Sequence, residues 1–152
     1  MQQRQILACE LTTPEVGDPT AVPDLLDQID TPFETFMGDG AFDGETSQAV
    51  LSKQPEAQIV VPPHKTAVCS SAGDTQRDQH IRDIKEHGRI AWQKKNDYGL
   101  RAHVELAIQR YKRIIGCVMK ARALAQQKTQ AWVSASALNI MSDLGMPVSV
   151  KI

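Results

Sequence analysis

The chain has 152 residues and a net charge of −1, and 41% of its residues are hydrophobic. This length suits one domain that can bury a core. The sequence holds no run of about 18 apolar residues, so it predicts no membrane span, and its first residues lack a signal-peptide pattern. The three cysteines, Cys9, Cys69 and Cys117, lie too far apart for a paired metal motif, and we expect a reducing, cytoplasmic location.

The first 61 residues predict three strands and two short helices. Short apolar runs that end at proline or glycine predict strands over Gln5–Leu11, Phe33–Gly38 and Ala57–Val61. Helices are predicted over Asp24–Ile29 and over Gly44–Lys53. The residue before the second helix, Asp43, is expected to cap it by accepting hydrogen bonds from its first free N–H groups.

The rest of the chain predicts helices over Asp74–Trp92, Leu100–Met119 and Thr129–Leu144. In the second of these, apolar residues at 104, 108 and 115 predict a buried stripe, with Glu105 at its edge. Both tryptophans, at 92 and 132, are expected in the core. Strands that alternate with helices and are followed by further helices predict an α/β layer fold.

Charge is distributed unevenly along the chain. Residues 1–50 hold ten acids and one base, residues 51–100 eight bases and six acids, and residues 101–152 eight bases and two acids. A basic second half could bind a polyanion, although charged helix faces in solvent give the same pattern. The four histidines form no complete zinc-binding pattern, and we expect them at the surface or at helix ends.

The segment from Tyr98 to Lys112 carries the most specific pattern. Its only acidic residue is Glu105, and Tyr98, Arg101 and Lys112 lie seven before, four before and seven after it. In a continuous helix these four side chains fall within about 60° of one another. A carboxylate can hold a hard cation and the two cations can hold phosphate oxygens, so this stripe suits chemistry on a phosphodiester.

A second candidate is Asp39, which lies between two glycines directly after a predicted strand. Such strand ends are where α/β sheets place ligands, and glycine allows a bulky group to approach closely. An ordinary Asp-Gly turn gives the same three letters. The presence of Glu105 as a possible partner favours the functional interpretation.

These motifs resemble those of a known family. Tyr98, Arg101, Glu105 and Lys112 have the spacing of the YREK signature of DDE-type insertion-sequence transposases, and GDGAFD, residues 38–43, is similar to the family's second catalytic block. The stretches 59–67, 87–95 and 137–147 also resemble that family, so the resemblance covers nearly the whole chain in the right order.

The resemblance implies a ribonuclease H-like fold and a metal-dependent reaction. Three carboxylates, two Asp and one Glu, would hold two divalent ions, Mg²⁺ or Mn²⁺, that activate the attacking group and stabilise the leaving oxygen. By resemblance, Asp39 is the second Asp and Glu105 is the Glu. Arg101 and Lys112 would contact the DNA backbone, with Tyr98 near the transferred end. The reaction is cleavage at the element's ends and strand transfer into target DNA.

The resemblance also implies that something is missing. The family's first Asp lies on a strand that precedes the segment resembling Gln5–Leu11, so residues 1–152 are expected to be the carboxyl-terminal part of the catalytic domain. The small sheet would lack its first two, central strands and be flanked by helices. Self-association or a full-length transposase is then an expected partner, besides DNA. The alternative function is a non-catalytic remnant that binds DNA or transposase and modulates transposition.

Overall fold

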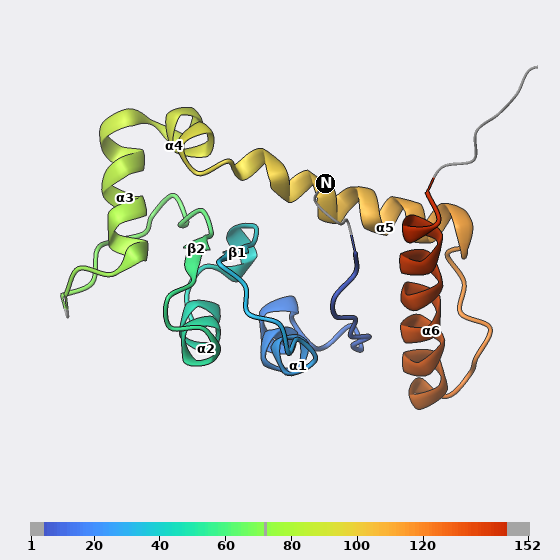
Figure 1. Cartoon of the computed structure of the whole chain (residues 1–152). Helices are drawn as coiled ribbons and strands as arrows, with labels where there is room; N and C mark the ends of the chain where they lie inside the picture. Colours follow the sequence, from blue (N-terminus) through green and yellow to red (C-terminus); the bar gives the residue numbers. More distant parts are fainter. Residues whose placement is uncertain (1–4, 72, 146–152) are drawn as a thin grey trace, which may run out of the picture. The chain divides into compact units, whose positions relative to one another are not determined.

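The computed structural model describes residues 5–71 and 73–145 (Figure 1). Contacts divide the chain into two compact units. The sheet unit comprises Pro14–Ala102, and the helical unit comprises the described residues up to Thr13 and from His103 onward. The expectation that residues 1–152 are the carboxyl-terminal part of a catalytic domain remains a prediction.

The sheet unit is built on two parallel strands, β1 (Thr35–Met37) and β2 (Gln58–Val60), in which Phe36 is paired with Ile59. The connection between them contains α2 (Thr46–Lys53), so the three elements form a β–α–β unit. Both strands and α2 lie within the predicted ranges. Their pairing confirms the α/β class, with a small parallel sheet and six α-helices in the described part of the chain.

The core of the sheet unit lies between the strands and two helices. Helices α1 (Val22–Asp27) and α2 contact each other, and in Figure 1 both lie on the opposite side of the strands from α3 (Gln76–His87). A short 3₁₀ turn, Asp18–Ala21, leads into α1. The buried apolar side chains of this core come from both helices and from β2 and its ends: Val22, Leu26, Val50, Ala57, Ile59 and Val61.

Helix α3 closes the outer edge of β2 with side chains. The amide group of Gln76 accepts from the Ile59 N–H at 2.9 Å and donates to the Ala57 carbonyl at 3.1 Å. A ring nitrogen of His80 lies 2.7 Å from the Ile59 carbonyl oxygen. These contacts satisfy main-chain groups that a further strand would otherwise bind.

A single helix was predicted over residues 74–92, but the structure breaks it at Gly88. Thr75 begins α3 with a capping box, and Gly88 ends it with φ 81°, a conformation that favours glycine. Helix α4 (Arg89–Lys95) follows and carries Trp92, which is 1% exposed and therefore in the core as predicted.

The expectation of surface histidines is wrong for His80, which is 9% exposed. The indole N–H of Trp92 donates to His80 Nδ1 at 2.9 Å. Because an indole only donates and a carbonyl only accepts, His80 is neutral with its proton on Nε2, which donates to Ile59. Three elements, β2, α3 and α4, are joined through this imidazole.

The helical unit consists mainly of α5 (Ala102–Ile114), whose first residue belongs to the sheet unit, and α6 (Leu124–Asp143). Two predictions about these helices are wrong. Val104 and Ile108 are 59% and 51% exposed, so they form no buried stripe beside Glu105. Trp132 on α6 is 60% exposed, whereas Ala135 and Leu138 on the same helix are buried. No helix in the described ranges is long and apolar enough to cross a bilayer.

The predicted strand over Gln5–Leu11 is not formed. Its chain is held by α6 instead: the Asn139 amide accepts from the Ile6 N–H and donates to the Ile6 carbonyl, both at 2.8 Å. Gln5 also donates to Asp143, and Glu10 pairs with Lys128. The segment is apolar enough for a strand, but side chains of a helix take the place of a strand partner.

Candidate functional site

Asp39 follows β1 directly and begins a short 3₁₀ turn, η2 (Gly40–Phe42). Its Oδ1 accepts from the Ala41 N–H at 2.9 Å, which fixes the direction of the carboxylate. The side chain is 44% exposed. The Phe42 ring packs closely against the preceding glycine, since a Cβ at Gly38 would lie 3.1 Å from that ring.

Arg101 lies beside Asp39, with 3.5 Å between Nη2 and Oδ2. Both residues belong to the sheet unit, 62 positions apart in sequence. The GDGAFD segment and Arg101 therefore meet at this ion pair within the sheet unit. The resemblance implies a DNA contact for Arg101, and no local pattern predicts its pairing with Asp39.

Tyr98 and Arg101 form a 3₁₀ helix, η3 (Tyr98–Arg101), and do not belong to α5. A 3₁₀ helix turns by about 120° per residue, whereas an α-helix turns by about 100°. Tyr98 therefore does not share one helical face with Glu105 and Lys112, as the predicted continuous helix would require. The Tyr98 ring lies 5.4 Å from the Trp92 ring, centroid to centroid, at an angle of 51°. Tyr98 is thereby oriented against the core of the sheet unit.

Glu105 and Lys112 lie on α5 in the helical unit and are both exposed. Their separation of seven residues places them on the same face of this helix. Arg110, on the same helix, is bound within the unit: it donates to the Leu138 carbonyl at 3.0 Å and to Ser142. Lys112 and Arg113 are exposed in the last turn of α5.

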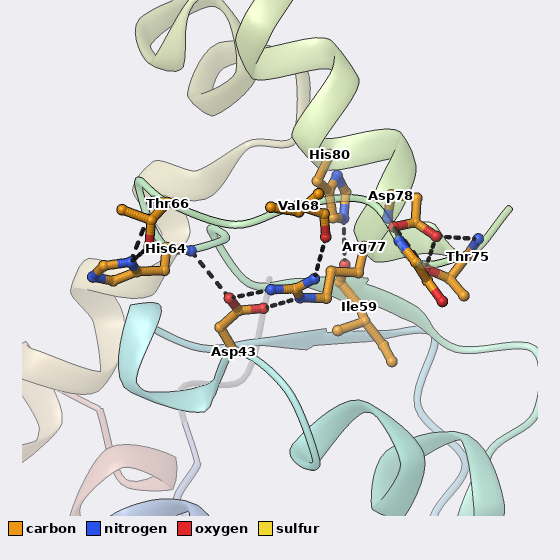
Figure 2. Close-up of polar contacts among 10 residues, drawn as sticks. Asp43, Ile59, His64, Thr66, Val68, Thr75, Arg77, Asp78 and His80 are labelled. Atoms are coloured by element: carbon orange, nitrogen blue, oxygen red, sulfur yellow. Dashed lines mark hydrogen bonds and ion pairs between the residues drawn. The ribbon is translucent and has the colours of Figure 1, made fainter. Parts of the chain in front are cut away.

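Asp43 is not the helix cap that sequence analysis predicted. It ends η2, and α2 begins after Glu45 with no side-chain cap. The carboxylate of Asp43 instead faces α3, where Arg77 donates from Nε at 2.6 Å and from Nη2 at 3.0 Å (Figure 2). The main-chain N–H of His64 donates to Oδ2 at 3.0 Å.

These contacts perturb the Asp43 carboxyl group. Burial by itself would raise the pKa of Asp43, but the hydrogen bonds from Arg77 and His64 and the nearby positive charges lower it. The pKa of Arg77 is raised by the same bond to Asp43. The pair is therefore ionised at neutral pH and joined by two parallel bonds.

A neighbouring acid, Asp78, serves the loop before α3. Its carboxylate accepts from the main-chain N–H groups of Ser70 at 2.7 Å and Thr75 at 3.2 Å, and from the Thr75 hydroxyl. These hydrogen bonds lower the pKa of Asp78. A pocket of about 540 Å³ opens between α2 and α3; its polar lining includes Asp43, Ser47, Arg77 and Asp78.

A hard divalent ion fits the chemistry of the two predicted ligands, since both Asp39 and Glu105 offer carboxylate oxygens. One oxygen of Asp39 is fixed by Ala41 and the other faces a cation, the kind of position that a metal ion could take. Within residues 5–71 and 73–145, no group of three or more His, Cys, Asp or Glu side chains is arranged to hold a metal.

A parallel β–α–β unit with a carboxylate at the end of its first strand, ion-paired to an arginine, defines an α/β protein with an acidic site at a strand end. The family model described as the transposase DDE domain matches residues 1–140. This match covers most of the chain, which therefore belongs to the transposase DDE domain family. No solved structure matches the chain.

Proposed function

We propose that this chain carries two of the carboxylates, Asp39 and Glu105, with which a ribonuclease H-like transposase cleaves DNA at the ends of an element and joins them to target DNA. The observation that carries the proposal is the meeting of Asp39 with Arg101 of the YREK signature. Asp39 belongs to the segment that resembles the second catalytic block and Arg101 to the segment that resembles the signature, so this contact supports the proposal.

When bound, Mg²⁺ or Mn²⁺ would supply Lewis-acid activation of the attacking oxygen and stabilisation of the leaving oxygen. The chain's own residues orient the site. The Ala41 N–H holds one Asp39 oxygen, and Arg101 compensates the charge of the other. Arg101 and Lys112 would bind phosphate oxygens of DNA, and Tyr98 would stack or donate a hydrogen bond near the transferred end.

We assign no residue of this chain to the family's first Asp. Two carboxylates leave a metal pair with too few ligands, and phosphoryl transfer depends on positioning. We therefore expect the chain by itself neither to cut nor to join DNA, and we propose that a catalytic assembly contains a further transposase molecule or a full-length transposase.

Iron-directed cleavage of the chain tests the shared metal. Fe²⁺ at an Mg²⁺ site, with ascorbate and peroxide, generates radicals that cut the polypeptide near its ligands. We expect cuts near residue 39 and near residue 105, both abolished by Asp39→Asn. The control is Asp27→Asn, which removes a carboxylate that is 80% exposed in an ion pair with Lys53 and should leave the cuts unchanged. Cuts at neither position would overturn the proposed metal site.

The second candidate is a non-catalytic protein that binds DNA or a transposase. The Asp39–Arg101 pair favours this non-catalytic candidate, because Arg101 already neutralises the Asp39 carboxylate without a metal ion. In that case DNA binding would persist and iron-directed cuts near 39 and 105 would be absent. The two candidates therefore give opposite results in the same experiment.

A further inference from the structure

We propose that Asp43 and Arg77 are positioning residues that hold the turn bearing Asp39, and that Asp43 is not itself a metal ligand. The inference rests on the proposed function of Asp39 as a ligand. Asp43, the second acid of GDGAFD, was expected to cap a helix, and this inference gives it a positioning role instead.

The two acids stand at the two ends of one short element. Asp39 precedes η2 and accepts from Ala41, whereas Asp43 follows η2 and its own N–H donates to the Gly40 carbonyl. A three-residue 3₁₀ turn has few internal bonds of its own. Its geometry therefore depends on what holds its ends.

The end at Asp43 is held by two other segments of the sheet unit. Arg77 comes from α3, and His64 comes from the chain that follows β2. The guanidinium of Arg77 also donates to the Val68 carbonyl at 3.4 Å, so it connects the turn to the loop before α3 (Figure 2). A planar, two-bond pair fixes orientation as well as distance.

The end at Asp39 is held by packing. The Phe42 ring covers Gly38 and meets the Phe36 ring edge-on, with centroids 6.4 Å apart. Phe36 lies in β1, so Phe42 joins the turn to the strand that precedes Asp39. With Asp43 clamped at one end and Phe42 packed on β1, the turn has little freedom to rotate the Asp39 carboxylate.

Asp43 and Asp39 differ in exposure and in hydrogen bonding, and this difference makes Asp39 rather than Asp43 the proposed metal ligand. The side chain of Asp43 is 10% exposed and both of its oxygens accept bonds from Arg77, with a further bond from His64. The side chain of Asp39 is 44% exposed. A metal ion at Asp43 would have to displace a charge-assisted pair, whereas at Asp39 it would displace one longer, more exposed contact.

Amide hydrogen exchange in the full chain tests the clamp. In Asp43→Asn and in Arg77→Lys, we expect the amides of Ala41 and His64 to exchange about tenfold faster or more, since bonds to charged groups are the stronger ones. Lysine keeps the charge of Arg77 but cannot form the planar two-bond pair, so it should not rescue protection.

Two further amides distinguish a positioning role of Asp43 and Arg77 from general support of the fold. The amides of Gln54, which follows α2, and Gly88, which follows α3, should keep their wild-type exchange rates. The matched control is Arg82→Lys, on the same helix, in an exposed pair with Asp74, and it should change none of these rates. Unchanged exchange at Ala41, or one common acceleration at all four amides, would overturn the proposal.

Mn²⁺ binding supplies the second readout. It is measured from the electron paramagnetic resonance signal of the free ion. We expect Asp43→Asn and Arg77→Lys to weaken binding by about tenfold, as loss of an outer partner of a ligand does, with Asp39→Asn at least as severe. Equal Mn²⁺ affinity in wild type and Asp39→Asn would reject the proposed metal site. Faster exchange at Ala41 would still establish the clamp, so the two failures are distinguishable.

Discussion

Asp39 and Arg101 form an ion pair across 62 residues of sequence, with 3.5 Å between Oδ2 and Nη2. The two side chains are 44% and 32% exposed, so the pair is accessible from solvent. A cation beside the carboxylate and a phosphate beside the guanidinium would each compete with this contact. Metal binding and DNA binding are therefore expected to depend on each other through Arg101.

Replacing Arg101 by Gln should raise the affinity for Mn²⁺ in the absence of DNA by about twofold to fivefold, the range for an exposed ion pair. Titration of the chain with Mn²⁺ measures the effect. Arg82→Gln, which removes an arginine from another exposed pair, should leave the affinity unchanged. Weaker Mn²⁺ binding in Arg101→Gln would show that Arg101 orients Asp39 for the ion.

Lys112 should contribute to DNA binding through a phosphate contact. We expect Lys112→Ala to reduce the magnitude of the slope of log affinity against log salt by about 0.9, and Arg101→Ala with Lys112→Ala by about 1.8. Arg110→Ala, on the same helix, should leave the slope unchanged because Arg110 is bound to Leu138 and Ser142. Salt titrations on duplex DNA decide between these values, and equal slopes for wild type and double variant would remove both residues from the interface.

The two tryptophans should respond very differently to truncation. Trp92 is 1% exposed and donates to His80, so Trp92→Ala should lower the free energy of unfolding by about 3–5 kcal/mol. Trp132 is 60% exposed, and Trp132→Ala should change it by no more than about 0.5 kcal/mol. Urea unfolding followed by circular dichroism measures both, and similar losses would show that Trp132 is covered in solution.

The Asp43–Arg77 pair should make stability depend on pH. Because the pKa of Asp43 is lowered in the folded state, its contribution is complete above the ordinary value of 3.8 and is lost as pH falls through the folded pKa. Asp43→Asn should cost about 1–3 kcal/mol near neutral pH, and the difference from wild type should disappear in acid. Unfolding at a series of pH values measures it; Asp27→Asn, in an exposed pair, should show little difference at any pH.

The side-chain amide of Asn139 should be required to hold the main chain of Ile6 against α6. Asn139→Asp keeps the acceptor for the Ile6 N–H but replaces the donor to the Ile6 carbonyl with a negative charge. We expect faster exchange of the Ile6 amide, with exchange in the sheet unit unchanged. A wild-type rate at Ile6 would mean that Gln5 and Glu10, through Asp143 and Lys128, are sufficient.

Local patterns determined the two strands of the sheet unit and the helix between them. Residues 33–38 and 57–61 were predicted as strands because short apolar runs end at Gly-Asp-Gly and at Pro-Pro, and β1 and β2 lie within them. Helix α2 forms within the predicted range of residues 44–53. Trp92 is buried as expected, but the same expectation fails for Trp132. The family likewise follows from motifs of fixed spacing, which the match to the transposase DDE domain confirms.

Only the tertiary structure decided the role of Asp43, because its partner Arg77 lies 34 residues away and no local rule connects them. The same holds for the pairing of Asp39 with Arg101. Residues 5–11 have a strand's apolar pattern, yet a strand needs a main-chain partner, and here the Asn139 side chain takes that place. Periodicity shows which side chains could be buried together, but whether Val104 or Trp132 is buried depends on a neighbouring surface, which sequence spacing does not specify.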